Sequence, residues 1–522
     1  MAMIDFFDRG WLINPKGAAY IQDERVYTFD EVGALSCQVA NAMLATGLPS
    51  GSKGAVWAGN DTTAWTCALG LWRANMCWLP VGARNLAEEN QYVLDQFDCE
   101  VLFYQSNFAP AISTIHARLP KIKHWICIDG ESPEIAGSVS LKSWVKDQPA
   151  TKPHLHVDLD DVVAVVPTGG TTGLPKGVMN THRTYQTAFI HFMMHCPYSS
   201  EERPVTLAAA PMTHTSGLLS IPVTSRGGTV VILAKPDPTL MLGAIPKYKV
   251  TELFLPPTVI YRLLEIPDLN MKVDFSSLKY LMYGAAPMSV EKLKLAMDIF
   301  GPVLVGGYGQ TEAAAAISLL RSDEHLVGGK AAPATRLSSV GRPSPLAHVE
   351  IMDDDNNILP RGQSGEICLR GDGVMRGYYK DPVKTAETII DGWLHTSDVG
   401  HIDDEGFLHI TDRKKDMIIS GGFNVYPSQI EQVIWGHPAV QDCAVIGVPD
   451  EKWGEAVKAV VELNAGQTVT AEEIMALCKA KLGSVMTPKT VDFIAQLPRS
   501  MVGKVLKKDL RAEYWKDSAR KI

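Results

Sequence analysis

Residues 162–177 read VVAVVPTGGTTGLPKG, an apolar run that passes directly into glycines, threonines and one lysine. The β-branched run 162–166 predicts a buried strand. In the loop after it, glycines let the backbone approach an anion closely, while amides, hydroxyls and Lys176 supply donors. It is not a Walker A loop, because no Gly-Lys-Ser/Thr follows. We predict a phosphate-binding loop made of Thr168, Gly169, Gly170, Thr171, Thr172, Gly173 and Lys176.

Around this loop, short apolar runs alternate with amphipathic ones from about Asp161 to Thr311. Such alternation predicts parallel strands with helices on the faces of the sheet. The predicted strands are 162–166, 205–210, 229–233, 253–255 and 280–283, and the predicted helices are 182–195, 240–245, 258–264 and 290–300. The stretch before about residue 150 repeats this pattern, with helices predicted over 29–45 and 62–74.

The last third of the chain has a different pattern of apolar segments. Between 335 and 410, short segments at 349–352 and 366–369 are separated by Gly, Pro and Asp, which predicts a small antiparallel region. After Arg413 a compact α+β pattern follows, with strands at 444–446, 458–461 and 491–494 and helices at 428–435 and 471–482. We predict an α/β protein with a large domain of layered, mostly parallel sheets over 1–412. A small, mobile α+β domain over 413–522 follows it.

Bulk composition excludes several classes of protein. A chain of 522 residues with 46% apolar residues, 20% charged residues and a net charge of -9 is typical of a multidomain globular protein. That charge argues against nucleic-acid binding through a basic surface. The nine scattered cysteines, without a Cys-x-x-Cys pair, indicate reduced thiols. Since we find neither a signal peptide nor a membrane-spanning stretch, we expect a cytoplasmic location.

Five further segments carry candidate site residues. Gly284-Ala285-Ala286-Pro287 follows the predicted strand 280–283, and Gly307-Tyr308-Gly309-Gln310-Thr311-Glu312 lies further along the chain. Trp393-Leu394-His395-Thr396-Ser397-Asp398 and Asp412-Arg413-Lys414-Lys415-Asp416 flank the predicted domain boundary. Near the end stands Pro498-Arg499-Ser500-Met501-Val502-Gly503-Lys504. Each segment alone is compatible with a solvated turn, so its functional reading depends on the joint occurrence of all of them.

Together these segments resemble the adenylate-forming enzymes, which include acyl-CoA synthetases, 4-coumarate–CoA ligases, firefly luciferase and peptide-synthetase adenylation domains. The resemblance runs through nearly the whole chain. The family's phosphate loop usually carries Ser where this chain has Gly169, which removes one hydroxyl but no backbone donor. The resemblance implies that the protein converts a carboxylic acid and ATP into acyl-AMP and pyrophosphate, and then transfers the acyl group to CoA.

The resemblance also implies roles for individual residues. Tyr308 would lie against adenine, Thr311 would approach the α-phosphate, and Glu312 with the Thr171 hydroxyl would hold Mg²⁺. Carboxylate and hydroxyl oxygens suit this hard cation. Asp398 and Arg413 would contact the ribose, Lys415 would be the hinge of the small domain, and Lys504 would reach the acyl carboxylate and the α-phosphate during adenylation. Nucleotide contacts are further expected from Gly284, Ala285, Ala286, Gly307, Gly309 and Gln310.

A second group of implied residues concerns CoA and the acid. Gly421 and Gly422 would let a pantetheine arm pass closely, since any Cβ there would narrow the path, and Ser420 and Trp453 would contact CoA. The acyl pocket is expected near His214, Gly284, Gly307 and 256–260; His214 would adjust its position between the half-reactions and would not act as a base. Medium-chain, alicyclic and aromatic acids all fit this description.

Several alternatives stay open at this point. The chain could load a carrier protein instead of free CoA, act as an oxygenase resembling luciferase, or be a non-catalytic nucleotide-binding relative. Retention of Lys176, Glu312, Asp398, Arg413 and Lys504 argues against the last. No Gly-x-Ser-x-Gly occurs, and no Gly-x-Gly-x-x-Gly follows a strand, which disfavours a serine hydrolase and a dinucleotide oxidoreductase. A homodimer and a regulatory lysine acetyltransferase acting on Lys504 are the protein partners considered.

Overall fold

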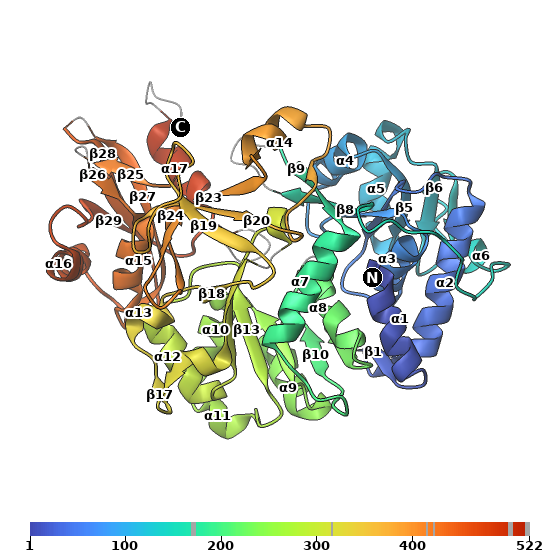
Figure 1. The fold of residues 1–522 in the computed structure, drawn as a ribbon, viewed down its shortest axis with the longest axis horizontal. Coiled ribbons are helices and arrows are strands. Elements are labelled where there is room, and N and C mark those ends of the chain that lie inside the picture. Colours follow the sequence, from blue (N-terminus) through green and yellow to red (C-terminus); the bar gives the residue numbers. More distant parts are fainter. Residues whose placement is uncertain are drawn as a thin grey trace.

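The computed structural model describes residues 1–168, 174–213, 215–314, 317–413, 416–420, 423–450, 452–499 and 505–516. Its N-terminal part forms a broad body of sheets and helices, and the last hundred or so residues form a smaller body at the opposite end (Figure 1). Within the described residues, no helix is long and apolar enough to cross a membrane. All nine cysteines are unpaired and buried, as expected for reduced thiols.

The first large sheet carries the start of the phosphate loop. Its strand order is β21-β9-β8-β4-β3-β5-β6-β7. β8 pairs parallel with β4 but antiparallel with β9, so the loop joins two neighbouring antiparallel strands. The other four strands predicted between Asp161 and Thr311 lie in a second sheet, so the alternation of strands and helices spans two sheets. The bounds are β3 (Lys53–Trp57), β4 (Cys77–Pro80), β5 (Cys99–Tyr104), β6 (His124–Cys127), β7 (Ser138–Ser140), β8 (Val162–Thr168), β9 (Lys176–Thr181) and β21 (Gly377–Tyr378).

The second large sheet holds the other four predicted strands. Its order is β18-β15-β14-β13-β12-β10-β11-β1-β2. The run from β14 to β1 is parallel, so the carboxyl ends of these strands share one edge, where ligands of α/β proteins bind. The bounds are β1 (Ala18–Gln22), β2 (Arg25–Thr28), β10 (Val205–Ala208), β11 (Thr229–Ile232), β12 (Glu252–Leu255), β13 (Tyr280–Gly284), β14 (Leu304–Tyr308), β15 (Ser318–Leu320) and β18 (Arg342–Pro343).

Helices cover these sheets, and several have the predicted bounds: α2 (Phe29–Ala45), α7 (His182–His195), α12 (Val290–Phe300) and α16 (Ala471–Leu482). The start of α2 is set by a capping box, because the Thr28 hydroxyl and the Glu31 carboxylate satisfy each other's amides. The remaining long helices are α1 (Met3–Ile13), α3 (Thr62–Arg73), α4 (Ala87–Gln96), α8 (Thr215–Thr224), α9 (Pro238–Tyr248) and α10 (Pro257–Leu264). α8 was not predicted from the sequence, because it contains Pro222, which usually ends a helix, and because burial on most sides removes the amphipathic stripe.

Two smaller sheets complete the chain. The first contains β19 (His348–Met352), β20 (Gly365–Arg370), β22 (Ile389–Ile390), β23 (Trp393–Ile402) and β24 (Leu408–Arg413), all antiparallel as predicted. The second contains β25 (Ile418–Ser420), β26 (Phe423–Val425), β27 (Val440–Asp450), β28 (Gly454–Leu463) and β29 (Thr490–Ile494), with α15 (Pro427–Trp435), α16 and α17 (Lys507–Trp515) against it. The predicted fold class is confirmed, whereas the domain boundary at 412/413 stays a prediction.

The second small sheet has a core of its own. Its buried side chains include Ile430, Val445 and Val457. One contact with the large body is a hydrogen bond from the Gln432 side-chain amide to the backbone oxygen of Met288, at 3.1 Å. A separate core with a polar contact of this kind suits a domain that changes its position.

Candidate functional site

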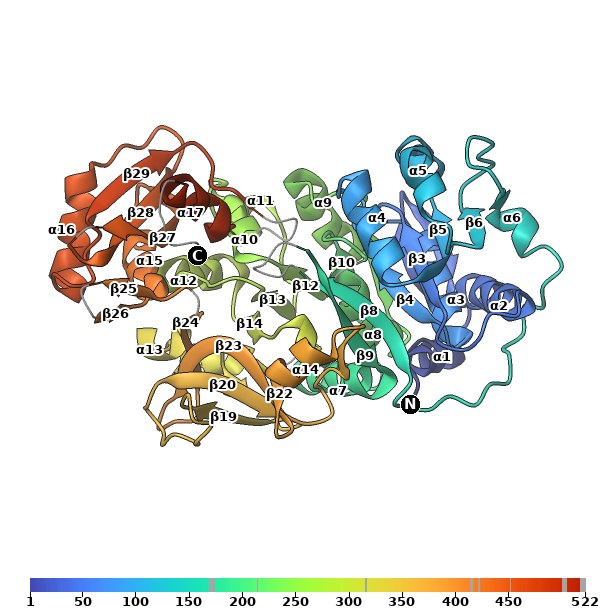
Figure 2. The ribbon, with the colours of Figure 1, turned by 90° about the horizontal axis from the view of Figure 1, so that it is seen from above.

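Three sheets lie side by side at the carboxyl edge of the parallel strands (Figure 2). Printed contacts bring most of the predicted nucleotide residues that the structure describes to this junction. β13 and β14 end there with Gly284 and Tyr308. A short 3₁₀ turn, Thr311–Ala313, follows β14. The first small sheet contributes Asp398 from β23, and the phosphate-loop sheet contributes Lys176 from β9. Segments far apart in sequence thus bring oxygen and nitrogen groups to one place.

Tyr308 and Asp398 form a direct pair across two sheets. The Tyr308 hydroxyl donates to Oδ2 of Asp398 at 2.7 Å. Both residues are buried, with 9% and 6% of their surface exposed. A hydrogen bond from a hydroxyl to a buried carboxylate is strong and directional, so it holds the aromatic ring and the carboxylate in one geometry. A planar ring beside a carboxylate is compatible with a nucleoside, because the ring can stack on a base and the carboxylate can accept from ribose hydroxyls.

Glu312 and Lys176 share one aromatic neighbour, Tyr378. The Tyr378 hydroxyl donates to Oε1 of Glu312 at 3.0 Å. Burial and the nearby Glu312 charge raise the pKa of Tyr378, so its hydroxyl keeps the proton that it donates. Nζ of Lys176 lies 5.0 Å from the centroid of the same ring, within the range of a cation–π contact. Burial, with the charge of nearby Lys384, lowers the pKa of Lys176 against the opposing effect of Glu312.

At the junction, the ends of β13 and β14 leave no room for a side chain at Gly284. Gly284 and Gly307 are register partners on β13 and β14. A Cβ on Gly284 would lie 2.5 Å from the backbone oxygen of Gly307, which is shorter than any real contact. The next residue, Ala285, has a φ of 65°, a left-handed conformation that costs a non-glycine residue about 1 kcal/mol or more. Strained backbone of this kind collects at ligand sites.

Two buried amide atoms near this junction have no hydrogen-bond partner among the described residues: Nε2 of Gln310 and Oδ1 of Asn180. The other end of Asn180 donates to the Thr311 backbone oxygen at 3.5 Å. Buried polar atoms are nearly always paired, so these atoms indicate a place where a polar ligand would complete the hydrogen bonding. Together with the carboxylate of Glu312 and the ammonium of Lys176, they fit a nucleotide with its cation.

Several predicted residues lie outside the described residues: Gly169, Gly170, Thr171, Thr172, Gly173, His214, Lys415, Gly421, Gly422 and Lys504. The backbone of Arg413 lies opposite Asp398 in the β23–β24 pairing, but its side chain is not described. Thr168 ends β8, opposite Lys176. The roles assigned to all of these residues stay predictions.

The predicted CoA residues that are described lie together in the small sheet, away from the junction. Ser420 pairs in register with Gly454, directly after Trp453. Ser420 is buried, whereas 40% of the Trp453 surface is exposed. Two ammonium groups, those of Lys452 and Lys489, lie 5.0 and 6.0 Å from the Trp453 ring. An exposed aromatic ring with cations beside it is a surface that suits an anionic group.

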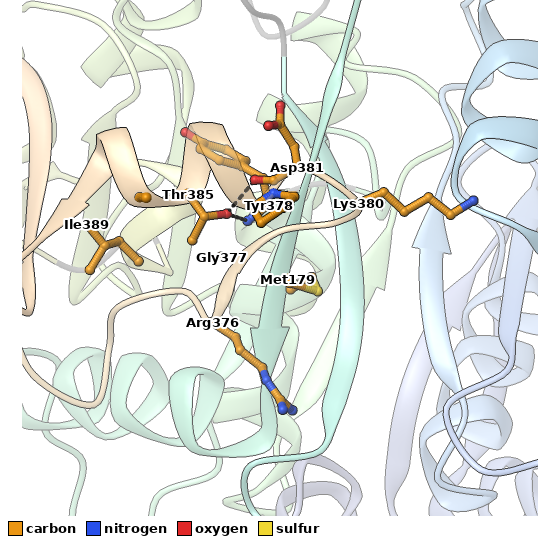
Figure 3. Close-up of a pocket in the computed structure, with 10 residues that line it drawn as sticks. Met179, Arg376, Gly377, Tyr378, Lys380, Asp381, Thr385 and Ile389 are labelled. Atoms are coloured by element: carbon orange, nitrogen blue, oxygen red, sulfur yellow. Dashed lines mark hydrogen bonds between the residues drawn. The ribbon is translucent and has the colours of Figure 1, made fainter.

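A shallow hollow of about 490 Å³ lies beside the junction, between β9, β21 and α14 (Pro382–Thr388). Figure 3 shows Lys380 extending away from α14, and its Nζ pairs with Asp98 at 2.6 Å. Thr385 closes the turn by donating to the Asp381 oxygen and accepting from the Tyr378 amide, each at 2.8 Å. The hollow therefore shares Tyr378 with the junction, and these hydrogen bonds hold that residue in place.

Sequence reasoning missed Tyr378 and Asn180. Neither belongs to a segment with a recognisable anion-binding pattern, and each reaches the site only through strand pairing, since Tyr378 on β21 lies opposite Val178 on β9. The Arg376-Gly377-Tyr378-Tyr379 segment offers one signal, a glycine between aromatic and basic residues. Without the strand register, that signal indicates nothing about Glu312.

Comparison with known proteins decides the family. The profile described as "AMP-binding enzyme" matches residues 7–379, and the profile described as "AMP-binding enzyme C-terminal domain" matches residues 429–504. The chain belongs to the AMP-binding enzyme family. The predicted membership of the adenylate-forming enzymes, in their acyl-CoA synthetase branch, is confirmed, and the chain is an AMP-forming ligase.

Individual relatives of this AMP-binding enzyme cover it almost completely. Feruloyl-CoA synthase of Amycolatopsis sp is 32% identical over 96% of this chain and 97% of the relative. Long-chain-fatty-acid–CoA ligase FadD13 of Mycobacterium tuberculosis is 31% identical over 97% of this chain and 98% of the relative. Among solved structures, the amide bond synthetase McbA of Marinactinospora thermotolerans matches with a TM-score of 0.88 and 28% identity, covering 98% of this chain and 100% of McbA.

Proposed function

We propose that this AMP-binding enzyme is an ATP-dependent acid–CoA ligase that works in two steps. In the first step, a carboxylate oxygen of the acid attacks the α-phosphorus of ATP, the bond to the β-phosphate breaks, and acyl-AMP and pyrophosphate form. In the second step, the CoA thiolate attacks the acyl carbon and AMP leaves with the electrons of the C–O bond. No covalent enzyme intermediate is needed, so the residues act by position and charge.

The observation that carries this proposal is the convergence of the Tyr308–Asp398 pair with Glu312 and Lys176 at one edge. Tyr308 lies against adenine while Asp398 accepts the ribose hydroxyls, with Arg413 as a second contact on the facing strand. Lys176 and the backbone of the phosphate loop bind the phosphates. The unpartnered amides of Gln310 and Asn180 support a polar ligand at the same place.

Glu312 is the residue that suits magnesium in this arrangement. Its carboxylate offers the oxygen ligand that Mg²⁺ prefers, and Thr171 supplies a hydroxyl from the phosphate loop. When bound, Mg²⁺ neutralises charge on the β- and γ-phosphates and eases the departure of pyrophosphate. The Tyr378 hydroxyl orients Glu312 for this task.

The small domain is proposed to serve both steps in turn. Lys504 offsets the negative charge that develops as the carboxylate attacks phosphorus. Rotation about Lys415 then withdraws Lys504 and presents Gly421 and Gly422 to the pantetheine arm. Trp453, with its neighbouring lysines, suits the phosphates of CoA.

The acid is proposed to be of medium chain length, alicyclic or aromatic, bound near His214, Gly284 and Gly307. The relatives support this breadth, since one is a feruloyl-CoA synthase and another a long-chain-fatty-acid–CoA ligase. McbA makes amides, so the acceptor also requires a test. A homodimer and acetylation of Lys504, which would remove its charge and stop adenylation, stay predictions.

One experiment tests the proposal. The purified protein is incubated with Mg-ATP and a panel of fatty, alicyclic and aromatic acids, and pyrophosphate, AMP and acyl products are quantified. Parallel reactions contain CoA, a phosphopantetheinylated carrier protein, or a primary amine as acceptor. We expect pyrophosphate with a subset of acids and thioester with CoA. Pyrophosphate release without CoA thioester would contradict the proposal that CoA accepts the acyl group. Absence of pyrophosphate with every acid would contradict the proposed adenylation.

A further inference from the structure

The backbone directly before Asp398 is strained. Ser397 has a φ of 61°, in the left-handed region that glycine adopts readily and serine does not. Asp398, the proposed ribose ligand, follows it and points its carboxylate at the Tyr308 hydroxyl. A strained residue persists only where its surroundings hold it, so contacts of Ser397 influence where the Asp398 carboxylate lies.

This strain belongs to a bulge in β23. Glu366 on β20 pairs with Val399, and Cys368 pairs with His395. Between these two pairs β20 has only residue 367, whereas β23 has residues 396, 397 and 398. The extra residues loop outward, and a bulge of this kind re-aims a side chain. Here the re-aimed side chain is that of Asp398.

Two side chains, those of Glu366 and Thr396, hold the bulge through hydrogen bonds to backbone groups. The Ser397 amide donates to Oε1 of Glu366 at 2.8 Å. The Thr396 hydroxyl donates to the backbone oxygen of Ile367 at 2.7 Å, and the Asp398 amide donates to that hydroxyl at 3.1 Å. The strained amide is therefore held by a carboxylate from the neighbouring strand.

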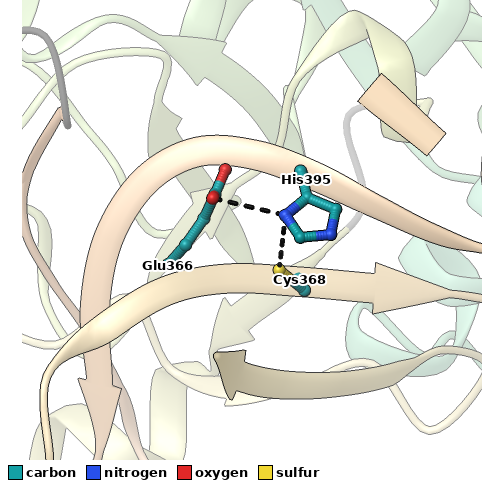
Figure 4. Close-up of side chains that lie close together, drawn as sticks. All are labelled: Glu366, Cys368 and His395. Carbon is teal, nitrogen blue, oxygen red and sulfur yellow. Dashed lines mark hydrogen bonds and ion pairs between the residues drawn. The ribbon is translucent and has the colours of Figure 1, made fainter. Parts of the chain in front are cut away.

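The Glu366 carboxylate is itself anchored. Its Oε2 lies 3.3 Å from Nδ1 of His395, and the same nitrogen lies 3.4 Å from Sγ of Cys368 (Figure 4). The Glu366 and His395 side chains are only 11% and 10% exposed. With Oε1 on an amide and Oε2 on an imidazole, the carboxylate has little freedom to rotate.

We propose that Glu366 is a positioning residue for the nucleotide. By holding the Ser397 amide in its left-handed conformation, it aims the Asp398 carboxylate at the ribose hydroxyls. This inference rests on the proposed function, because it assumes that Asp398 binds ribose. Glu366, Cys368 and His395 also place donor atoms within 4.8 Å of one another, a spacing that a metal ion could use, so metal content forms part of the test.

The test compares binding of AMP and of 2′,3′-dideoxy-AMP by titration calorimetry, which requires no knowledge of the acid. Glu366→Met removes the acceptor at similar length, and Glu366→Gln keeps an acceptor oxygen. Glu350→Met is the matched control, since Glu350 lies on the adjacent strand opposite Cys368 and pairs with His348 instead of the bulge. Ser397→Gly is combined with Glu366→Met, because glycine adopts the left-handed conformation without help.

We expect Glu366→Met to weaken AMP binding about tenfold, as for loss of a buried hydrogen bond to a charged group, and to leave dideoxy-AMP binding unchanged. Glu366→Gln and Glu350→Met retain most of the AMP affinity, and the Ser397→Gly combination restores it. If Glu366→Met does not fold, Thr396→Val, which removes the other clamp of the bulge, takes its place with the same expected pattern.

Equal weakening of both nucleotides by Glu366→Met, or no restoration by Ser397→Gly, would overturn the proposal. So would one bound metal ion per chain whose removal by a chelator reproduces the Glu366→Met loss. Failure of the proposed function has a different signature, because the wild-type protein would then bind neither nucleotide measurably.

Discussion

Removal of one hydroxyl, in Tyr378→Phe, tests the proposed role of Glu312 most directly. The hydroxyl donates to Oε1 of Glu312 at 3.0 Å, while the ring is the surface on which Lys176 lies at 5.0 Å. Phenylalanine keeps the ring and its volume and deletes only the donor. The change therefore isolates the orientation of Glu312 from the packing of Lys176.

The magnitude follows from the burial of the two partners. A hydrogen bond to a charged group contributes about 1.5–3 kcal/mol when buried. Tyr378 is buried, with 7% of its surface exposed, but Glu312 is only half-buried, so solvent screening reduces the effect. We expect a loss of about 1–1.4 kcal/mol, or about five- to tenfold in kcat/KM for Mg-ATP, since about 1.4 kcal/mol is a factor of ten.

The assay is the initial rate of pyrophosphate release as a function of Mg²⁺ concentration at saturating acid. Because the variant perturbs the proposed magnesium ligand, the deficit should shrink as Mg²⁺ rises. Tyr379→Phe is the matched control: it deletes the neighbouring tyrosine hydroxyl, which donates to Asp98 at 2.8 Å instead of Glu312. Equal losses in both variants, or a Tyr378→Phe deficit that Mg²⁺ does not change, would refute the reasoning.

Three further predictions concern Lys504, Gly284 and the buried His182. Lys504→Ala should abolish pyrophosphate release yet leave thioester formation from pre-made acyl-AMP largely intact; equal loss of both half-reactions would contradict the two-step proposal. Gly284→Ala places a Cβ 2.5 Å from the Gly307 oxygen, and should lower stability by about 1–3 kcal/mol with a matching fall in Tm, whereas Gly243→Ala, whose Cβ meets nothing within 4 Å, should not. Burial lowers the pKa of His182 from 6.5 to about 4, so the folded state resists a proton that the unfolded state accepts, and stability should fall as pH drops from about 6.5 to 4, by up to about 1.4 kcal/mol per pH unit. His182→Gln should flatten this part of the Tm–pH curve. Parallel Tm–pH curves for the wild type and the variant would show that His182 does not cause the loss of stability.

Local patterns were sufficient for much of the fold. The bounds of α2, α7, α12 and α16 follow from apolar spacing and end signals that lie within a few residues of each helix. α8 could not be found in this way, because Pro222 breaks the pattern and its burial arises from packing between sheets. The same limit explains why periodicity does not separate 162–166 from the strands of the second sheet, since a buried strand has the same pattern in either sheet.

The sequence by itself determined the family and supplied the candidate nucleotide residues, because both depend on residue types at short spacing; the phosphate loop stays a prediction. Only the tertiary structure decided which of these residues meet. Asp398 is 90 positions from Tyr308, and Tyr378 is 66 positions from Glu312, yet each pair shares one hydrogen bond. Hydrogen bonds act over about 3 Å, and a separation of that size between distant segments is set by strand register and sheet packing. The bulge that aims Asp398 is likewise a property of two paired strands, and neither strand shows it alone.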